Sequence, residues 1–405
     1  MSLSADPRRR LQARAFGLTW LSYASYYLCR KNLSVVKSRL DDELHVGVTT
    51  LGAIDTAYLV AYAGGQFLNG ALGDRWGARR MIAAGMLASA AACVVFGAAS
   101  SAWVFAIAFG LNGLFQSTGW PNNVKVMGAW FGRRLRGRIM GLWSTNYQIG
   151  GLAATALAAF LLVRFGWRAA FLLPAIATAL VGVAVGVFLI EAPEPEAEAE
   201  ASAPGSPASP FASMLRLPAV WILGGAYFGL KLIRYSLLFW LPFFLRRSLG
   251  YDDGTAGYVS TAFEAGGIAG AILVGWVADR WFTANPLRLV VPLVLALGGA
   301  LFTLRLVAPS GTAATIAGLA AVGFLLFGPD TLISGAAAQN LGRERATASA
   351  AGIINGFGSV GAASQGMLTA AIAQRWGWDA LFLCFVGFAV LSALALLPLA
   401  WRRSF

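Results

Sequence analysis

The sequence predicts an all-α membrane protein with twelve transmembrane helices in two six-helix, pseudo-symmetric bundles. The first observation is composition: 58% of the 405 residues are hydrophobic and only 12% are charged. Such a chain is too apolar for a soluble domain. The second observation is that apolar stretches recur along the whole chain, and the third is that motifs of the first half return in the second.

Twelve apolar stretches are long enough to cross a bilayer, which takes about 20 helical residues. They are residues 14–36, 50–72, 80–99, 103–131, 138–163, 168–190, 218–245, 255–278, 287–307, 312–340, 346–374 and 378–400. Between the sixth and seventh stretches, Glu, Ala, Ser and Pro predominate, a composition that cannot form a packed core. We therefore expect an N-terminal bundle over 1–190, a flexible cytoplasmic linker over 191–217 and a C-terminal bundle over 218–405.

An internal repeat supports the two-bundle organisation. The tract Gly70–Arg75 (GALGDR) returns in outline as Gly275–Arg280 (GWVADR), 205 residues later. The tetrapeptide Arg164–Trp167 (RFGW) returns as Arg375–Trp378 (RWGW), 211 residues later. The chain is therefore predicted to be a duplicated six-span unit.

The distribution of basic residues in the loops predicts the orientation. Basic residues are more frequent in the loops on the side of the two termini, and both termini are therefore expected in the cytoplasm, with the chain in the cell membrane. The opposite loops hold fewer, including Lys37 and Arg39. This topology accounts for the net charge of +13 without a nucleic-acid partner. No small-residue cleavage site follows the Arg-rich start, so no removable signal peptide is expected.

Arg30 and Arg234 are permanent charges inside apolar stretches, at matching places of the two halves. An unpaired guanidinium at membrane depth costs at least about 2.5 to 3.5 kcal/mol, which indicates a functional site. Each lies roughly 24 Å along its helix if the spans begin at Arg14 and Pro218. Glu264 has a similar predicted depth and could pair with a base when substrate is absent. The two arginines predict a central cavity for an anion.

The charges predicted within the spans leave a surplus of two positive charges. The bases are Arg30, Lys31, Lys125, Lys231 and Arg234, and the acids are Asp55, Glu264 and Asp330. A phosphate ester carries about −1.5 to −2 charges near neutral pH, which fits this surplus. Lys125 and Asp330 are expected nearer the cytoplasmic side, and Asp55 toward the outside. Each of the two aspartates is expected either in a structural or gate ion pair or in a direct functional role.

Arginine suits phosphate because its planar fork can donate two parallel hydrogen bonds to oxyanion oxygens. Tyrosines accompany the bases: Tyr26 and Tyr27 precede Arg30, and Tyr235 follows Arg234. Their hydroxyls could bind phosphate or a sugar, or the rings could serve packing alone.

Catalysis and metal binding find no support in the sequence. It contains no paired nucleophile and base and no cluster of metal ligands, so we expect neither an enzyme nor a cofactor. The single histidine, His45, falls in a polar loop, which excludes a histidine proton relay within the membrane. The three cysteines are isolated, which argues against a disulfide framework.

The tract from Gly70 to Arg80 is a predicted cytoplasmic turn in which Gly77 permits a tight turn. Asp74 can pair there with bases or with a helix N-terminus in one state of a carrier. This tract resembles the signature of the major facilitator superfamily. The resemblance implies gating roles for both copies, namely for Asp74, Arg75, Asp279 and Arg280.

Three segments resemble the organophosphate:phosphate antiporter family: Tyr26–Asn32, Gly113–Pro121 and Arg234–Pro242. The resemblance implies that Arg30 and Arg234 hold phosphate. It further implies that Lys31 assists them and that Glu264 exchanges partners during transport. The predicted substrate-contacting residues are Arg30, Lys31, Arg234, Lys231, Tyr26, Tyr27, Lys125, Trp120, Tyr147 and Tyr235.

This chain departs from the glycerol-3-phosphate carriers of that family at two positions. Tyr147 stands where they have a histidine, and Phe239 where they have an acid. Lys231 instead resembles the eukaryotic sugar-phosphate branch. The organic group of the substrate therefore stays open.

The expected function is exchange of an organophosphate for inorganic phosphate by alternating access. The expected partners are a phosphorylated small molecule, inorganic phosphate and the lipid bilayer, and a monomer is expected. Two alternatives remain: a membrane receptor for a sugar phosphate, and a proton-coupled anion symporter that titrates Glu264 or Asp330.

Overall fold

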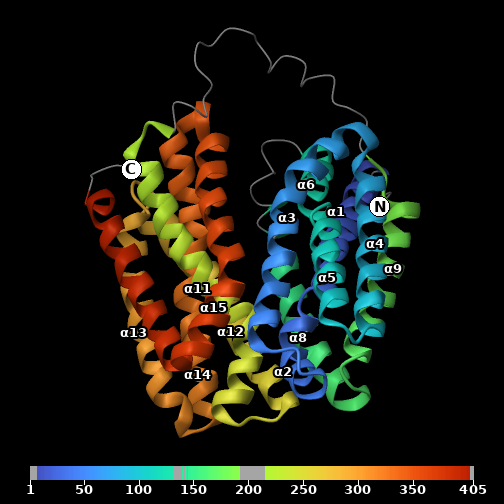
Figure 1. Cartoon of the computed structure of the whole chain (residues 1–405). Helices are drawn as coiled ribbons and strands as arrows, with labels where there is room; N and C mark the ends of the chain where they lie inside the picture. Colours follow the sequence, from blue (N-terminus) through green and yellow to red (C-terminus); the bar gives the residue numbers. More distant parts are fainter. Residues whose placement is uncertain (1–6, 132–138, 141, 144, 192–214, 402–405) are drawn as a thin grey trace, which may run out of the picture. The chain divides into compact units, whose positions relative to one another are not determined.

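The computed structural model describes residues 7–131, 139–140, 142–143, 145–191 and 215–401 (Figure 1). Over these ranges all regular structure is helical. The chain divides into two compact units, Met1–Val46 with Ala53–Ala203 and Gly47–Gly52 with Pro204–Phe405. Most of the predicted linker, residues 192–214, lies outside the described residues.

The first unit, in blue to green in Figure 1, is built from helices that run back and forth. They are α1 (Pro7–Tyr26), η1 (Tyr27–Cys29), α2 (Asn32–Leu44), α3 (Val48–Trp76), α4 (Ala78–Ala98), α5 (Ala102–Gln116), α6 (Gly119–Trp130), α8 (Thr145–Phe165) and α9 (Ala169–Phe188). Helix α1 packs against α6, α8 and α9, and α4 packs against α5 and α9.

The second unit is also built from antiparallel helices (Figure 1). They are α11 (Pro218–Leu249), α12 (Asp253–Trp281), α13 (Leu287–Val307), η2 (Ala308–Ser310), α14 (Thr312–Leu332), the π-helical segment η3 (Ile333–Ala337) and α15 (Ala338–Ala400). Helix α11 packs along α15, and α12 packs along α14.

Eight helices of the described part are long and apolar enough to cross a membrane. The predicted first, second and fourth spans are not among these eight helices. The first and fourth are each divided into shorter helices, whereas the second is the single helix α3. Helix α15 covers the predicted eleventh and twelfth spans. Gly377, with φ of 83°, separates them, because a left-handed residue cannot continue a right-handed helix.

The glycine of the repeated tetrapeptide has nearly the same φ in both units. This glycine, Gly166 in one copy and Gly377 in the other, adopts φ of 81° and 83°. An L-residue with a side chain pays a steric cost there, and glycine does not. The duplication inferred from the sequence is therefore visible in the backbone.

The turn between α3 and α4 agrees with its sequence. Gly77 has φ of 86°, which confirms the predicted tight turn. At the start of α4, the backbone N–H of Arg79 donates to Oε1 of Glu191 at 2.8 Å. A carboxylate at this end of a helix is stabilised by the helix dipole.

Glycines allow matching helix pairs to pack closely in both units. A side chain at Gly113 would overlap the carbonyl oxygen of Tyr58, and a side chain at Gly323 would overlap that of Phe263. These contacts join α3 to α5 and α12 to α14. Small residues at such contacts are typical of helices packed within a membrane.

We predict that Gly166→Ala and Gly377→Ala each destabilise the protein by about 1 kcal/mol, because alanine is strained at positive φ. The measurement is thermal unfolding in detergent, followed by tryptophan fluorescence. Gly225→Ala is the matched control, since Gly225 is helical and has open space where a Cβ would lie. Unchanged melting temperatures in both variants would contradict this interpretation.

Candidate anion-binding site

The predicted first span is a broken helix. Helix α1 ends at Tyr26, a 3-10 turn follows, and α2 begins at Asn32. Arg30 and Lys31 connect the two, and both backbone N–H groups donate to the carbonyl of Tyr27, at 3.0 and 2.9 Å. The prediction of a continuous helix over 14–36 was wrong here. Discontinuous helices commonly form the binding sites of transporters.

The predicted fourth span is also broken, and its break faces that of the first span. Helix α5 ends at Gln116 and α6 begins at Gly119. The hydroxyls of Tyr26 and Thr118 share a hydrogen bond of 2.8 Å, and the Tyr26 hydroxyl also lies 3.3 Å from the carbonyl oxygen of Ile82. Tyr26 is fully buried, so its placement favours packing at this junction over contact with a substrate.

Tyrosine rings surround the guanidinium of Arg30, which is only 5% exposed. Its Cζ lies 4.6 Å from the ring centre of Tyr27, 4.9 Å from that of Tyr62 and 5.8 Å from that of Tyr58. Cation–π contacts of this kind stabilise a buried positive charge without neutralising it.

A polar network fixes the orientation of Arg30. Its Nε donates to Oε1 of Gln116 at 2.9 Å, and the Tyr58 hydroxyl donates to the same oxygen at 2.8 Å. Nε2 of Gln116 in turn donates to Asn112 at 3.1 Å and lies 3.3 Å from the Ser89 hydroxyl. The amide is thereby held with its oxygen toward the guanidinium.

Part of the Arg30 fork is left available. Within the described ranges, Nη2 is buried without a hydrogen-bond partner, and no carboxylate pairs with Arg30. A buried donor without a partner is costly, so such groups in native structures usually serve a ligand or another function. Arg30 therefore offers an anion both charge and a hydrogen-bond donor.

The carbonyl of Cys29, at the break itself, has two donors from neighbouring helices. Nδ2 of Asn112 donates at 2.7 Å and the Cys93 thiol at 3.6 Å. These hydrogen bonds replace the intrahelical bond that the Cys29 carbonyl lacks where the helix is interrupted.

In the second unit, Arg234 and Lys231 contact one carboxylate. Nη1 of Arg234 donates to Oδ2 of Asp330 at 2.6 Å, and Nζ of Lys231 lies 3.5 Å from Oδ1. All three side chains are 15% exposed or less. Asp330 lies in the last turn of α14, directly before η3, and such π-helical segments are frequent at functional sites.

Aromatic rings also flank these bases. Nζ of Lys231 lies 5.0 Å from the ring centre of Tyr227 and 5.6 Å from that of Tyr235. Cζ of Arg234 lies 4.2 Å from the ring centre of Phe327. The predicted cluster of Lys231, Arg234 and Tyr235 is therefore present on one stretch of α11.

The other predicted substrate residues have different surroundings. Lys31 is buried, 3% exposed, next to Arg30. Trp120 packs against Tyr23 and Trp143, and Tyr147 packs against the same apolar core. Lys125 is exposed, and its Nζ donates to the carbonyl of Gly73 at 3.3 Å, which associates it with the Gly70–Arg80 turn.

The residues predicted to act in gating differ in their exposure. Glu264 is buried on α12, 6% exposed. Arg75, Asp279 and Arg280 are exposed at the ends of their helices. The side chain of Asp74 lies outside the described part.

Two placements differ from the sequence analysis. Asp330 was expected nearer the cytoplasmic side, yet it contacts Arg234. Counting residues along separate helices does not show which side chains meet, so this contact was not predicted. Lys37, assigned to a loop, is instead fully buried in an ion pair with Asp55, so it adds a base to the intramembrane charges.

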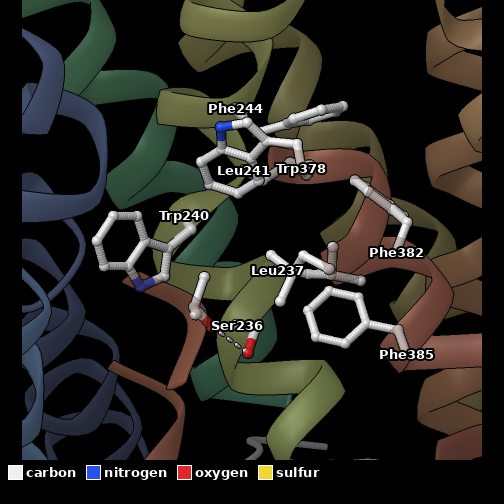
Figure 2. Close-up of a pocket in the computed structure, with 10 residues that line it drawn as sticks. Ser236, Leu237, Trp240, Leu241, Phe244, Trp378, Phe382 and Phe385 are labelled. Carbon is white, nitrogen blue, oxygen red and sulfur yellow. Dashed lines mark hydrogen bonds between the residues drawn. The ribbon is translucent and has the colours of Figure 1, made fainter. Parts of the chain in front are cut away.

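A pocket between α11 and α15 has a different character (Figure 2). Its walls are Ser236, Leu237, Trp240, Leu241, Phe244, Thr369, Trp378, Leu381, Phe382 and Phe385. Thr369 donates to Ser236 at 2.8 Å, and these ten residues include no charged side chain. The pocket therefore does not suit an anion.

Sequence reasoning assigned no role to Gln116, Tyr58 or Tyr62. The available signal was the spacing of Asn112 and Gln116, two amides four residues apart on one face of an apolar stretch. Buried amides in a membrane helix need hydrogen-bond partners, and here one partner is Arg30.

Apolar helices in two repeated units, with buried bases at helix breaks, define a polytopic membrane protein of the transporter class. The model of the Major Facilitator Superfamily matches residues 19–364. The chain belongs to this superfamily, which accounts for the twelve-span plan predicted from the sequence.

Proteins from animals and a plant are similar along nearly the whole chain. The glucose-6-phosphate exchanger SLC37A2 of Mus musculus is 31% identical, with 95% of this chain and 91% of that protein covered. The putative glycerol-3-phosphate transporter 1 of Arabidopsis thaliana is 31% identical, with 95% and 87% covered. Sugar phosphate exchanger 3 of Homo sapiens is 30% identical, with 96% and 93% covered.

Solved structures support the fold. A bacterial homologue of the human lysosomal transporter Spinster has TM-scores of 0.75 in its unoccupied and 0.78 in its occupied inward-facing conformation. Each alignment covers 99% of this chain and 98% of the other, at 16% and 15% identity. At this identity the likeness concerns the fold.

We predict that Asp55→Asn destabilises the protein by about 3 to 5 kcal/mol, because it leaves the Lys37 charge buried without its carboxylate. The double variant Lys37→Met with Asp55→Leu is the matched control and should recover most of the loss, since neither charge remains. Thermal unfolding in detergent measures both. Equal losses in the single and double variants would contradict a role for the pair in stability.

Proposed function

We propose that this protein is a secondary transporter that exchanges an organophosphate for inorganic phosphate by alternating access. Its relatives are named as exchangers of glucose 6-phosphate and sugar phosphate and as putative transporters of glycerol 3-phosphate. A sugar phosphate or glycerol 3-phosphate is the proposed organic substrate class, and transport rather than catalysis is the proposed activity.

The observation that carries this proposal is the environment of Arg30. A buried guanidinium whose Nε is held by a neutral amide, and whose Nη2 has no partner in the described part, is suited to a phosphate. Phosphate oxygens match the arginine fork and supply the counter-charge that the surrounding rings lack.

The same chemistry extends to the other bases. Lys31 adjoins Arg30 and contributes a compact positive charge. In the second unit, Arg234 supplies the guanidinium and Lys231 the compact charge. Tyr27 and Tyr235 are proposed to contact the substrate, the first through its ring beside Arg30 and the second beside Lys231. Glu264, Asp74, Arg75, Asp279 and Arg280 are proposed to exchange ion pairs as the carrier changes state.

Electrostatics explains why exchange is expected rather than one-way transport. Closing an empty carrier would desolvate bases whose charge is not neutralised, which is costly. A bound phosphate carries about −1.5 to −2 charges and cancels most of that excess. Each crossing is then favoured only when the site is loaded.

The proposed organisation follows the sequence predictions. Bundles over 1–190 and 218–405 flank a cytoplasmic linker over 191–217, and both termini lie in the cytoplasm. The proposed location is the cell membrane, and the proposed working unit is a monomer. No cofactor or nucleic acid is required.

Uptake into proteoliposomes tests the proposal. Vesicles are loaded with unlabelled phosphate or left empty, and labelled phosphate is supplied outside. Uptake only into loaded vesicles supports exchange, and competition by glycerol 3-phosphate, hexose 6-phosphates or phosphoglycerates identifies the organic group. Ligand binding without uptake would favour a receptor, and uptake into empty vesicles driven by a pH gradient would favour a proton symporter.

We predict that Arg30→Lys and Arg234→Lys each reduce phosphate exchange to a few per cent or less, because an ammonium cannot reproduce the two-pronged contact of a guanidinium. Initial rates of exchange in loaded proteoliposomes measure this. Arg168→Lys and Arg375→Lys are matched controls at exposed positions and should retain normal rates. Normal exchange in either test variant would disprove the proposed phosphate-binding role of that arginine.

A further inference from the structure

The two buried arginines contact side chains of different charge. In the first unit, Nε of Arg30 donates to Gln116, at the end of α5. In the second unit, Nη1 of Arg234 donates to Asp330, near the end of α14. Both partners belong to the fourth span of their own unit. The first is a neutral amide and the second is a carboxylate.

Gln116 orients Arg30 without reducing its charge. The amide oxygen accepts from both Arg30 and Tyr58, and the amide nitrogen is directed toward Asn112 and Ser89. All of these partners are neutral, so the full positive charge of Arg30 remains for a ligand. Because Nε is held, the Nη groups of the fork have a defined direction.

Asp330 reduces the charge of the other cluster. It lies 2.6 Å from Arg234 and 3.5 Å from Lys231, so one carboxylate contacts two positive charges. All three groups are largely buried, where charges interact more strongly than in water. A phosphate that approaches Arg234 must therefore compete with the Asp330 carboxylate and is repelled by it.

We propose that Asp330 is a built-in counter-anion that phosphate displaces from Arg234 and Lys231, and that Gln116 is a positioning residue that keeps Arg30 uncompensated. This inference rests on the proposed function and assigns unequal roles to the two arginines. Arg30 supplies most of the binding, and Asp330 weakens binding enough for release. A carrier needs both binding and release of its substrate, because a site that binds too tightly turns over slowly.

The test moves one negative charge between the two units. Asp330→Asn removes the counter-anion, Gln116→Glu places a carboxylate beside Arg30, and the double variant restores the original total charge. Two quantities are measured for each: the Kd of inorganic phosphate for the purified protein in nanodiscs, and the rate of phosphate exchange in loaded proteoliposomes. Asp379→Asn is the matched control for the first variant, because Asp379 is exposed and pairs with Arg305. Gln374→Glu at an exposed position is the control for the second.

The expected changes in Kd have opposite signs. Asp330→Asn should lower Kd about tenfold and slow exchange, whereas Gln116→Glu should raise Kd by about 100-fold or more. The double variant should bind at least about tenfold more tightly than Gln116→Glu alone. The controls should match the wild type. Opposite effects on binding and turnover in Asp330→Asn would not arise from a merely structural residue.

The outcomes separate this inference from the proposed function. If the wild type neither binds nor exchanges phosphate, the proposed function fails. If the wild type exchanges phosphate while Asp330→Asn does not tighten binding, the counter-anion role is wrong, and if Gln116→Glu binds normally, the positioning role is wrong. Should one single variant fail to fold, as judged by size-exclusion chromatography, the other single variant and the double variant decide the matter.

Discussion

The arrangement of the first unit depends on keeping one guanidinium charged in an apolar bundle. Arg30 lies where the first span is interrupted, and the interruption brings it to Gln116, at the interruption of the fourth. Three tyrosine rings and a chain of neutral polar groups accommodate the charge. An acid in their place would be simpler, but it would consume the charge that a substrate needs.

The second unit meets the same requirement in a different way. Its seventh span, α11, is continuous, and the irregular backbone lies in the tenth, where η3 follows α14. The charge of Arg234 and Lys231 is shared with Asp330. Duplication has therefore preserved the helix plan and the close glycine contacts of α3 with α5 and α12 with α14, while the electrostatics of the two units diverged.

Much of this could be predicted from the sequence, because it depends on local rules. Helix length, the repeat and the turn at Gly77 follow from hydropathy and from the conformational freedom of glycine. The break in the first span could not be predicted, because the residues between α1 and α2, Tyr27 to Lys31, include neither glycine nor proline. The pair of Lys37 with Asp55 escaped prediction for the same reason: a lysine near a span end reads as a loop residue unless its buried carboxylate partner is known.

The hydrogen bond from the Cys93 thiol to the Cys29 carbonyl gives this protein an internal chemical reporter. The chain has only three cysteines; Cys29 and Cys93 are buried at the helix break, and Cys384 is exposed. With Cys384 replaced by serine, the remaining thiols are those of Cys29, which contacts Thr178, and of Cys93, which donates to the Cys29 carbonyl at the helix break. The rate at which alkylating reagents modify these native cysteines would then report how often that region opens, without the introduction of new cysteines.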